Sequence, residues 1–212
     1  MRSISKGIEP PELKAWKSLE NEEWTPTYAI LQNPEKRQLH LALLREQGYT
    51  CCYCGREIDL DVSHIEHFRP KSRYADLDLA YENLHASCQR ETPLNAPLVC
   101  GHLKGEEFDE AAFLSPLLPE IETRFSYTFL GEVVPRGDAS ATMIRVLGLN
   151  KPFFTSRRIE ALQAIFDSDF LASASEEELR KIVIEFRKFS ADGKLSSFFH
   201  VVARFAEDLL SV

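Results

Sequence analysis

The sequence has no apolar run approaching the roughly 20 residues that a membrane-spanning helix needs. Its N-terminal stretch, MRSISKGIEPPELKAWKSLE, has no apolar core of the kind found in a signal peptide. Internal repeats and low-complexity linkers are absent as well. The composition, with 44% hydrophobic and 27% charged residues, is ordinary for a globular protein. We therefore expect a globular protein of the cytoplasm with no membrane association.

An excess of positive charge is also missing. The formal net charge is −8 at pH 7. A protein that holds nucleic acid unaided normally shows a broad basic face, because phosphate neutralisation supplies most of the affinity. Any basic surface must therefore be local, and a nucleic-acid-directed activity would rely on another chain for targeting.

The number of cysteines is odd. Five cysteines in a chain without an export signal argue against a disulfide framework. Cys51 and Cys54 have the C-x-x-C spacing that lets two thiolates reach one zinc ion, and Cys88 and Cys100 could complete a four-cysteine site. The spacing of the second pair is unusual, so burial as small hydrophobic side chains is an alternative. A redox pair is another, although the strand-then-helix context is missing. Cys52 is assigned to packing.

Helical patterns at both ends frame a central part that is rich in cysteine and histidine and poor in periodicity. We expect an α+β protein in three parts: a helical segment at 1–49, a core at 50–105, and a hairpin with C-terminal helices at 106–212. A small core like that of the central part usually needs a cross-link to be stable, and a bound metal ion is the obvious candidate.

Several elements outside the core are predicted from apolar spacing and from start and stop residues. Residues 10–47 are helical in pattern, and RFSYTFLGEVVPRG indicates a hairpin that turns at Gly131. Ser175 and Glu178 have capping-box spacing at the start of a helix. The other predicted helices are ATMIRVLGLN, KPFFTSRRIEALQAIFDSDFL and LSSFFHVVARFAEDLL. The aromatic residues expected in the core are Phe186, Phe189, Phe198, Phe199 and Phe205.

Histidine is scarce in this chain, yet the stretch SHIEHFRPKS at 63–72 holds two. Side chains alternate along a strand, so His64 and Glu66 would share one face while His67 points to the other. Pro70 ends regular pairing because it has no N–H. A strand end that starts to turn before Pro70 would still let Glu66 and His67 reach one cleft. The alternative is a surface strand without a chemical role.

A one-metal nuclease needs few groups. Ligands hold a divalent ion on the scissile phosphate, a neutral histidine deprotonates water, and a third group orients that histidine. Histidine suits the base, because its ordinary pKa of about 6.5 leaves it largely neutral at cellular pH. Asn83 in YENLHASC and His102 in CGHLKG follow downstream in a suitable order.

This ordered pattern, a cysteine pair, an acid before H-x-x-P, then N-L, cysteine, and a histidine near K-G, resembles the HNH endonuclease family. More narrowly, IEHFRPKS, ENLHASCQ and CGHLKG resemble PtuB proteins, the HNH components of Septu and retron anti-phage systems. The motifs cover 51–105. The resemblance implies a ββα-metal core, Mg or Mn as the catalytic ion, Zn as a structural ion, and a nucleic-acid substrate, with DNA expected ahead of RNA. It also implies an SMC-like ATPase partner of the PtuA type.

Carried over by position, the resemblance implies that His67 is the general base and that Glu66 and His102 bind the catalytic ion. Asn83 would orient the base or its loop. The implied zinc ligands are Cys51, Cys54, Cys88 and Cys100. The sequence departs from the family pattern in two places: Gly101 intervenes between the last cysteine and His102, and an insertion separates the last two cysteines.

The role of His64 stays open among an alternative base, a contact to the metal ligands or the substrate, and a structural histidine. The other histidines, His40, His85 and His200, are expected in packing or on the surface. A local basic patch could hold phosphates that flank the cut, without reading sequence. Its residues are Arg69, Lys71, Arg73 and Lys104.

Two functions are consistent with these residues. The first is a metal-dependent HNH endonuclease that hydrolyses nucleic acid as the effector of an anti-phage complex, with an ATPase partner docked on the C-terminal helices. The second is a non-catalytic, zinc-braced module that binds nucleic acid or protein. The acid–histidine pair followed by a downstream histidine favours catalysis.

Overall fold

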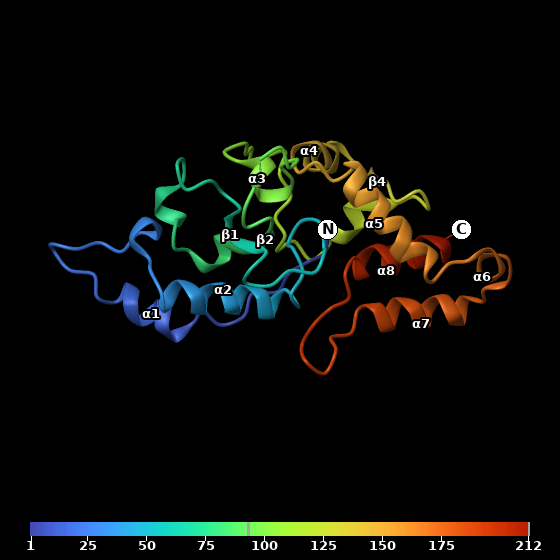
Figure 1. The fold of residues 1–212 in the computed structure, drawn as a ribbon, viewed down its shortest axis with the longest axis horizontal. Coiled ribbons are helices and arrows are strands. Elements are labelled where there is room, and N and C mark those ends of the chain that lie inside the picture. The colour runs from blue at the N-terminus through green and yellow to red at the C-terminus, as the bar shows by residue number, and fades with distance from the viewer. Residues whose placement is uncertain (93, 212) are drawn as a thin grey trace.

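Two small antiparallel sheets lie within a mostly helical chain in the computed structural model, which describes residues 1–92 and 94–211. The first sheet pairs β1 (Ser63–His67) with β2 (Leu84–Cys88), and the second pairs β3 (Phe125–Tyr127) with β4 (Val133–Pro135). The first sheet lies near the middle of an elongated molecule, with α1 towards one end and the C-terminal helices towards the other (Figure 1). The chain is therefore a mixed α+β protein, as the sequence predicted.

Eight α-helices surround these sheets in the described residues. They are α1 (Pro11–Lys17), α2 (Glu35–Glu46), α3 (Cys100–Lys104), α4 (Asp138–Val146), α5 (Pro152–Gln163), α6 (Ser168–Ser173), α7 (Glu176–Phe186) and α8 (Phe199–Leu209). Short 3-10 turns occur at Tyr28–Ile30, Ala75–Leu77, Tyr81–Asn83 and Ile121–Arg124. None of these helices has the length and apolar character that would let it cross a membrane.

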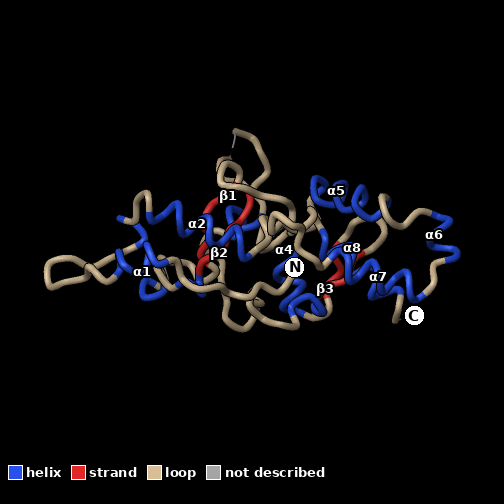
Figure 2. The backbone as a smooth tube through the Cα atoms, turned by 90° about the horizontal axis from the view of Figure 1, so that it is seen from below, coloured by secondary structure: helices blue, strands red, loops and turns tan. Residues whose placement is uncertain are grey.

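Helix α2 lies beside the β1–β2 hairpin (Figure 2). Leu39, Leu43 and Leu44 are fully buried, because their spacing places them on one face of the helix. The chain leaves α2 at Gly48, which has a φ of +59°, and a Cβ there would lie 2.7 Å from the Leu195 side chain. Glycine is thus required at this turn, and the predicted helix end is confirmed.

The C-terminal part follows the predicted pattern with two corrections. The hairpin turn at Gly131 and the capping box at the start of α7 are confirmed. The prediction of one helix over 151–171 is wrong, because α5 ends at Gln163 and a second helix, α6, follows. The Asp167 side chain caps α6 by accepting a 2.8 Å hydrogen bond from the Phe170 N–H. Phe189 is half exposed, because it follows the end of α7 and does not reach the core.

Candidate functional site

The four cysteines of the predicted zinc site converge next to the β1–β2 hairpin. Two of them precede β1, one ends β2 and one begins α3. Their sulfur atoms all lie within 4.8 Å of one another, and Cys54 Sγ is 3.9 Å from Cys88 Sγ. Four sulfurs bound to zinc at about 2.3 Å lie about 3.8 Å apart in a tetrahedron. The set, Cys51, Cys54, Cys88 and Cys100, is buried and free of disulfides, so it can hold a metal ion such as zinc.

The insertion between the last two cysteines does not separate them, because Gln89 closes it. The Gln89 side-chain amide donates to the Pro97 carbonyl, and its oxygen accepts from the Val99 N–H, both at 3.0 Å. Cys100 follows with a φ of +50°, a left-handed conformation that is uncommon for a side chain of this kind. Cys52 is buried but stands outside the four-thiol set.

Glu66 lies buried on one face of β1 and contacts three side chains. Its Oε1 is 2.9 Å from Lys104 Nζ and accepts a 3.1 Å hydrogen bond from the Tyr53 hydroxyl. Its Oε2 is 3.4 Å from His64 Nε2. Burial raises the pKa of Glu66, whereas the hydrogen bond with His64 and the charge of Lys104 lower it. The lowering effects together are larger, so the pKa lies below its ordinary value. Glu66 is therefore a carboxylate.

His102 approaches the same group from α3. Its ring centroid is 4.3 Å from that of His64. A Cβ at Gly101 would overlap Glu66 Oε2 and lie 2.9 Å from His64 Nε2, so the extra residue before His102 can be accommodated because it is glycine. The structure thus brings Glu66 and His102 together with His64 between them. Within the described residues, only the cysteines form a set whose ligand atoms all lie within 4.8 Å.

His67 points to the other face of β1, as strand alternation requires. Its Nε2 is 2.9 Å from the Asp78 carbonyl oxygen, which can only accept, so Nε2 carries the proton and Nδ1 keeps a lone pair. The Tyr28 ring packs edge-on at 4.5 Å between centroids. Burial lowers the pKa of His67 below its ordinary value, so the imidazole is neutral and able to accept a proton.

Asn83 holds the loop that orients His67. Its Oδ1 accepts from the Arg69 N–H at 2.7 Å, and its Nδ2 donates to the Arg69 and Leu77 carbonyls at 3.0 Å. These bonds fix the loop between the two strands next to Asp78, whose carbonyl receives the His67 proton donor. Asn83 is buried and therefore acts on the position of His67 through backbone contacts.

The four predicted phosphate-binding cations are placed differently from one another. Lys104 is 3% exposed, pairs with Glu66 and donates to the His67 carbonyl at 3.1 Å. Arg69 makes two hydrogen bonds with the Glu110 carboxylate, at 2.8 and 3.0 Å. Arg73 donates to the Phe108 carbonyl at 2.9 Å, and the Lys71 ammonium lies 5.0 Å from the Tyr28 ring centroid.

Sequence reasoning missed a cavity of about 700 Å³ that opens beside His64. Its lining includes Tyr28, Lys36, Arg37, His40, His64 and Arg90. Burial lowers the pKa of His40 to about 4, and the charges of His64, Arg90 and Lys36 add to this effect. The spacing of Lys36 and His40 on α2 was a signal, since residues four apart share a helix face. Arg90, from the loop after β2, joins them only through the fold.

Two curated proteins are similar to this chain. A putative HNH endonuclease of retron Vc95, from Vibrio cholerae serotype O1 biovar El Tor, is 28% identical over 152 residues, which cover 67% of this chain and 70% of that protein. The Septu protein PtuB of Bacillus thuringiensis is 37% identical over 76 residues, 33% of this chain and 30% of that protein. No protein-family model matches the sequence. These similarities confirm the resemblance to HNH nucleases of defence systems.

Proposed function

We propose that this chain is a metal-dependent HNH endonuclease that hydrolyses phosphodiester bonds as the effector of an anti-phage defence complex. The observation that carries the proposal is the state of His67: its Nε2–H is held by the Asp78 carbonyl in a loop fixed by Asn83, which leaves Nδ1 free to take a proton. The proposal is supported by the similarity to the two defence proteins.

In this proposal β1, β2 and α3 form the ββα-metal core. The four-cysteine set would hold a structural zinc ion that joins the turn between α2 and β1, the end of β2 and the start of α3. Such a staple suits a small core, because a short hairpin and a five-residue helix bury little apolar surface of their own. We assign the helical segment at 1–49 and the helices at 106–212 to the support of this core.

Glu66 and His102 would hold a catalytic Mg or Mn ion, with His64 as a neighbour that contacts both. Such an ion polarises the phosphate and stabilises the charge on the leaving oxygen. Lys104 keeps Glu66 ionised through their 2.9 Å ion pair and anchors the end of β1 through the His67 carbonyl. His67 Nδ1 would remove the proton from the attacking water, while its Nε2–H stays on the Asp78 carbonyl.

Cleavage of a plasmid by the purified chain in magnesium and in manganese, beside a His67→Ala twin, tests the proposal. We expect metal-dependent cutting that falls by at least about 100-fold in the twin, the scale of general-base catalysis. Added imidazole should restore part of the rate, which a structural role would not allow. Unchanged cutting by His67→Ala with equal zinc content would overturn the assignment of the base.

A partner chain is the second part of the proposal. The net charge of −8 leaves affinity for nucleic acid to another protein, and an SMC-like ATPase of the PtuA type would supply it. The C-terminal helices are the proposed docking surface, and they expose apolar side chains: Leu171 in α6 and Ile184 in α7 are 40% and 58% exposed. Efficient cutting by the chain alone at physiological salt would contradict this part.

One observation favours the alternative of a non-catalytic, zinc-braced binding module. Lys104 already neutralises Glu66, and the ligand atoms of Glu66, His64 and His102 have not drawn together as those of the cysteines have. In that case nucleic-acid binding would depend on zinc and would be indifferent to Glu66→Gln and His67→Ala. Cleavage in either metal would exclude the binding module, whereas nucleic-acid binding that survives both substitutions and is lost on removal of zinc would support it.

A further inference from the structure

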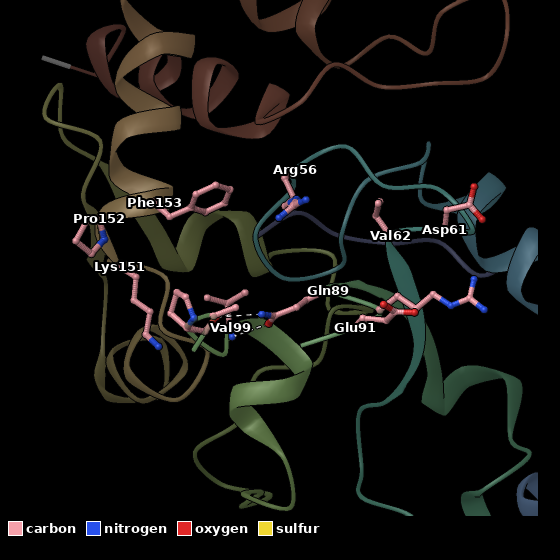
Figure 3. A pocket seen from close by; sticks show the side chains of 12 residues that line it. Arg56, Asp61, Val62, Gln89, Glu91, Val99, Lys151, Pro152 and Phe153 are labelled. Carbon is pink, nitrogen blue, oxygen red and sulfur yellow. Dashed lines mark hydrogen bonds between the residues drawn. The ribbon is translucent and has the colours of Figure 1, made fainter. Parts of the chain in front are cut away.

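A second cavity, of about 670 Å³, adjoins the one beside His64. The two cavities share Asp61 and Arg90 in their walls, so they lie side by side, and we call the pair the trough. The second cavity lies between the loop after β2 and the start of α5, and Figure 3 shows Phe153 and Arg56 on one side with Gln89 and Val99 opposite. The trough therefore leads from His64 to α5.

The two halves of the trough differ in chemistry. Lys36, Arg37 and Arg90 line the half beside His64, and in the described chain only Asp61 adds a carboxylate there. The half next to α5 is lined by the apolar residues Val62, Val99, Pro97, Pro152 and Phe153. Its charged residues are the cations Arg56, Arg90 and Lys151 and the carboxylates Asp61 and Glu91. Cations thus outnumber carboxylates along the trough, although the whole chain carries a net charge of −8.

Phe153 gives the apolar half a flat surface. Its side chain is 46% exposed at the first turn of α5, and the Arg56 guanidinium lies 5.6 Å from the centre of its ring. An exposed aromatic ring beside an arginine is a platform on which a nucleobase can stack, and base stacking is independent of sequence. The cations of the other half suit the phosphates of the same strand.

We propose that the trough binds a single-stranded segment of nucleic acid, with phosphates on Lys36, Arg37 and Arg90 and one unpaired base on Phe153. A base inside a duplex has both faces covered by its neighbours, so it cannot stack on Phe153 without leaving the helix. The inference rests on the proposed nuclease function, because it concerns the substrate of that site, and it specifies strandedness. DNA and RNA share this chemistry.

Binding is measured on the full chain carrying His67→Ala, so that the oligonucleotides stay intact. Fluorescence anisotropy compares a labelled single-stranded DNA, the same sequence as RNA, and the corresponding DNA duplex. We expect the single strands to bind more tightly than the duplex, and the DNA and RNA arms show which backbone is preferred. Phe153→Ala should weaken single-strand binding by about fivefold or more, the lower end for base–aromatic stacking, while Phe153→Trp retains it.

Matched controls use side chains outside the trough. Phe189→Ala removes a similarly exposed aromatic ring, and Lys181→Ala removes an exposed cation of α7. Arg90→Ala should make the negative slope of log K against log salt shallower by about 0.7, which corresponds to the loss of one phosphate contact on a single strand. Lys181→Ala should leave this slope unchanged.

Tighter binding to the duplex, no binding to any oligonucleotide, or equal effects of Phe153→Ala and Phe189→Ala would each overturn the inference. These outcomes are distinct from failure of the nuclease proposal. Plasmid cleavage without a single-strand preference rejects the trough alone. Single-strand binding that depends on Phe153, in a chain that cuts neither alone nor with its ATPase partner, rejects the nuclease and retains the trough.

Discussion

The four-cysteine set and the Glu66–His64–His102 group share the β1–β2 hairpin and α3, yet they are built differently. The cysteines supply four like atoms within 4.8 Å of one another. Glu66 instead is paired with Lys104 and Tyr53, and His64 faces a cavity of about 700 Å³. Structural metal sites are closed by protein ligands, whereas catalytic sites keep an open position. In our proposal the first group supports the fold and the second holds the catalytic ion.

The two regions touch through Ser87. Its hydroxyl oxygen accepts from the Gly101 N–H at 3.3 Å and lies 3.8 Å from Cys51 Sγ. Gly101 in turn packs against Glu66 and His64. Loss of the cysteine set should therefore disrupt the polar group, whereas a change in the polar group should leave the cysteine set intact. This asymmetry can be tested.

The largest effect is expected from Cys100→Ser. A structural zinc ion contributes about 10 kcal/mol or more to folding, as much as a typical domain has in total. We expect the variant to lose bound zinc and cooperative thermal unfolding, and to lose cleavage with them. Cys52→Ala is the matched control, because Cys52 is buried beside the set without belonging to it. Full zinc content in Cys100→Ser, with wild-type melting, would show that Cys100 is not a zinc ligand, and a wild-type chain without zinc would show that the cysteines are packing residues.

Glu66→Gln should reduce cleavage by more than about 100-fold and leave the zinc content unchanged. Loss of a residue that only hydrogen-bonds to a metal ligand costs up to about 100-fold, so a larger loss indicates a ligand. It also leaves the Lys104 ammonium buried without its counter-charge, which destabilises the fold. The double variant Glu66→Gln, Lys104→Met removes that charge and should recover thermal stability without recovering cleavage. Recovery of cleavage in the double variant would show that Glu66 supports the fold only.

Much of this arrangement was predictable from sequence, because local spacing encodes it. The C-x-x-C pair, the alternation that puts His64 and Glu66 on one face and His67 on the other, and the turn at Gly131 all follow from neighbouring residues. The burial of Lys104 did not follow, because its partner Glu66 lies far away in the sequence. A lysine near a glycine gives no local sign that a carboxylate will reach it.

The cavity residues and the closing of the insertion could not be predicted for the same reason. Arg90 meets Lys36 only after β2 is paired with β1 and α2 packs beside the hairpin. The bonds from Gln89 to the backbone of the insertion depend on a loop conformation that no spacing rule describes. Longer-range contacts of this kind determine the shape of the site, while its residue types are visible in the motifs.

Asn83→Ala should have an intermediate effect. The change removes three part-buried hydrogen bonds to the backbone of Arg69 and Leu77, which costs about 2–3 kcal/mol. Cleavage should fall because Asp78 no longer holds His67 in place. Asn83→Asp keeps the acceptor for the Arg69 N–H but places a carboxylate oxygen, which only accepts, against the Arg69 and Leu77 carbonyls, so we expect a loss of stability at least as large and a similar loss of cleavage. Urea unfolding and plasmid cutting measure the two effects, and equal stability in all three proteins would contradict the role of Asn83.

The smallest effect concerns the positive charge of the cavity. Burial, with the charges of His64, Arg90 and Lys36, lowers the pKa of His40 to about 4 in the folded chain, against about 6.5 when unfolded. Between these values the unfolded state binds the extra proton, so the stability that neutral His40 contributes is complete above pH 6.5, declines as the pH falls, and levels off below about 4. His40→Gln removes the titrating group and can keep the 2.8 Å hydrogen bond to Ser63. In this pH range it should reduce the slope of the unfolding free energy against pH by about 1 kcal/mol per pH unit. Urea unfolding of both proteins at pH 7 and pH 5 measures the difference, in which the other titrating groups cancel. Parallel pH profiles would show that burial and the neighbouring cations do not keep His40 neutral in the folded chain.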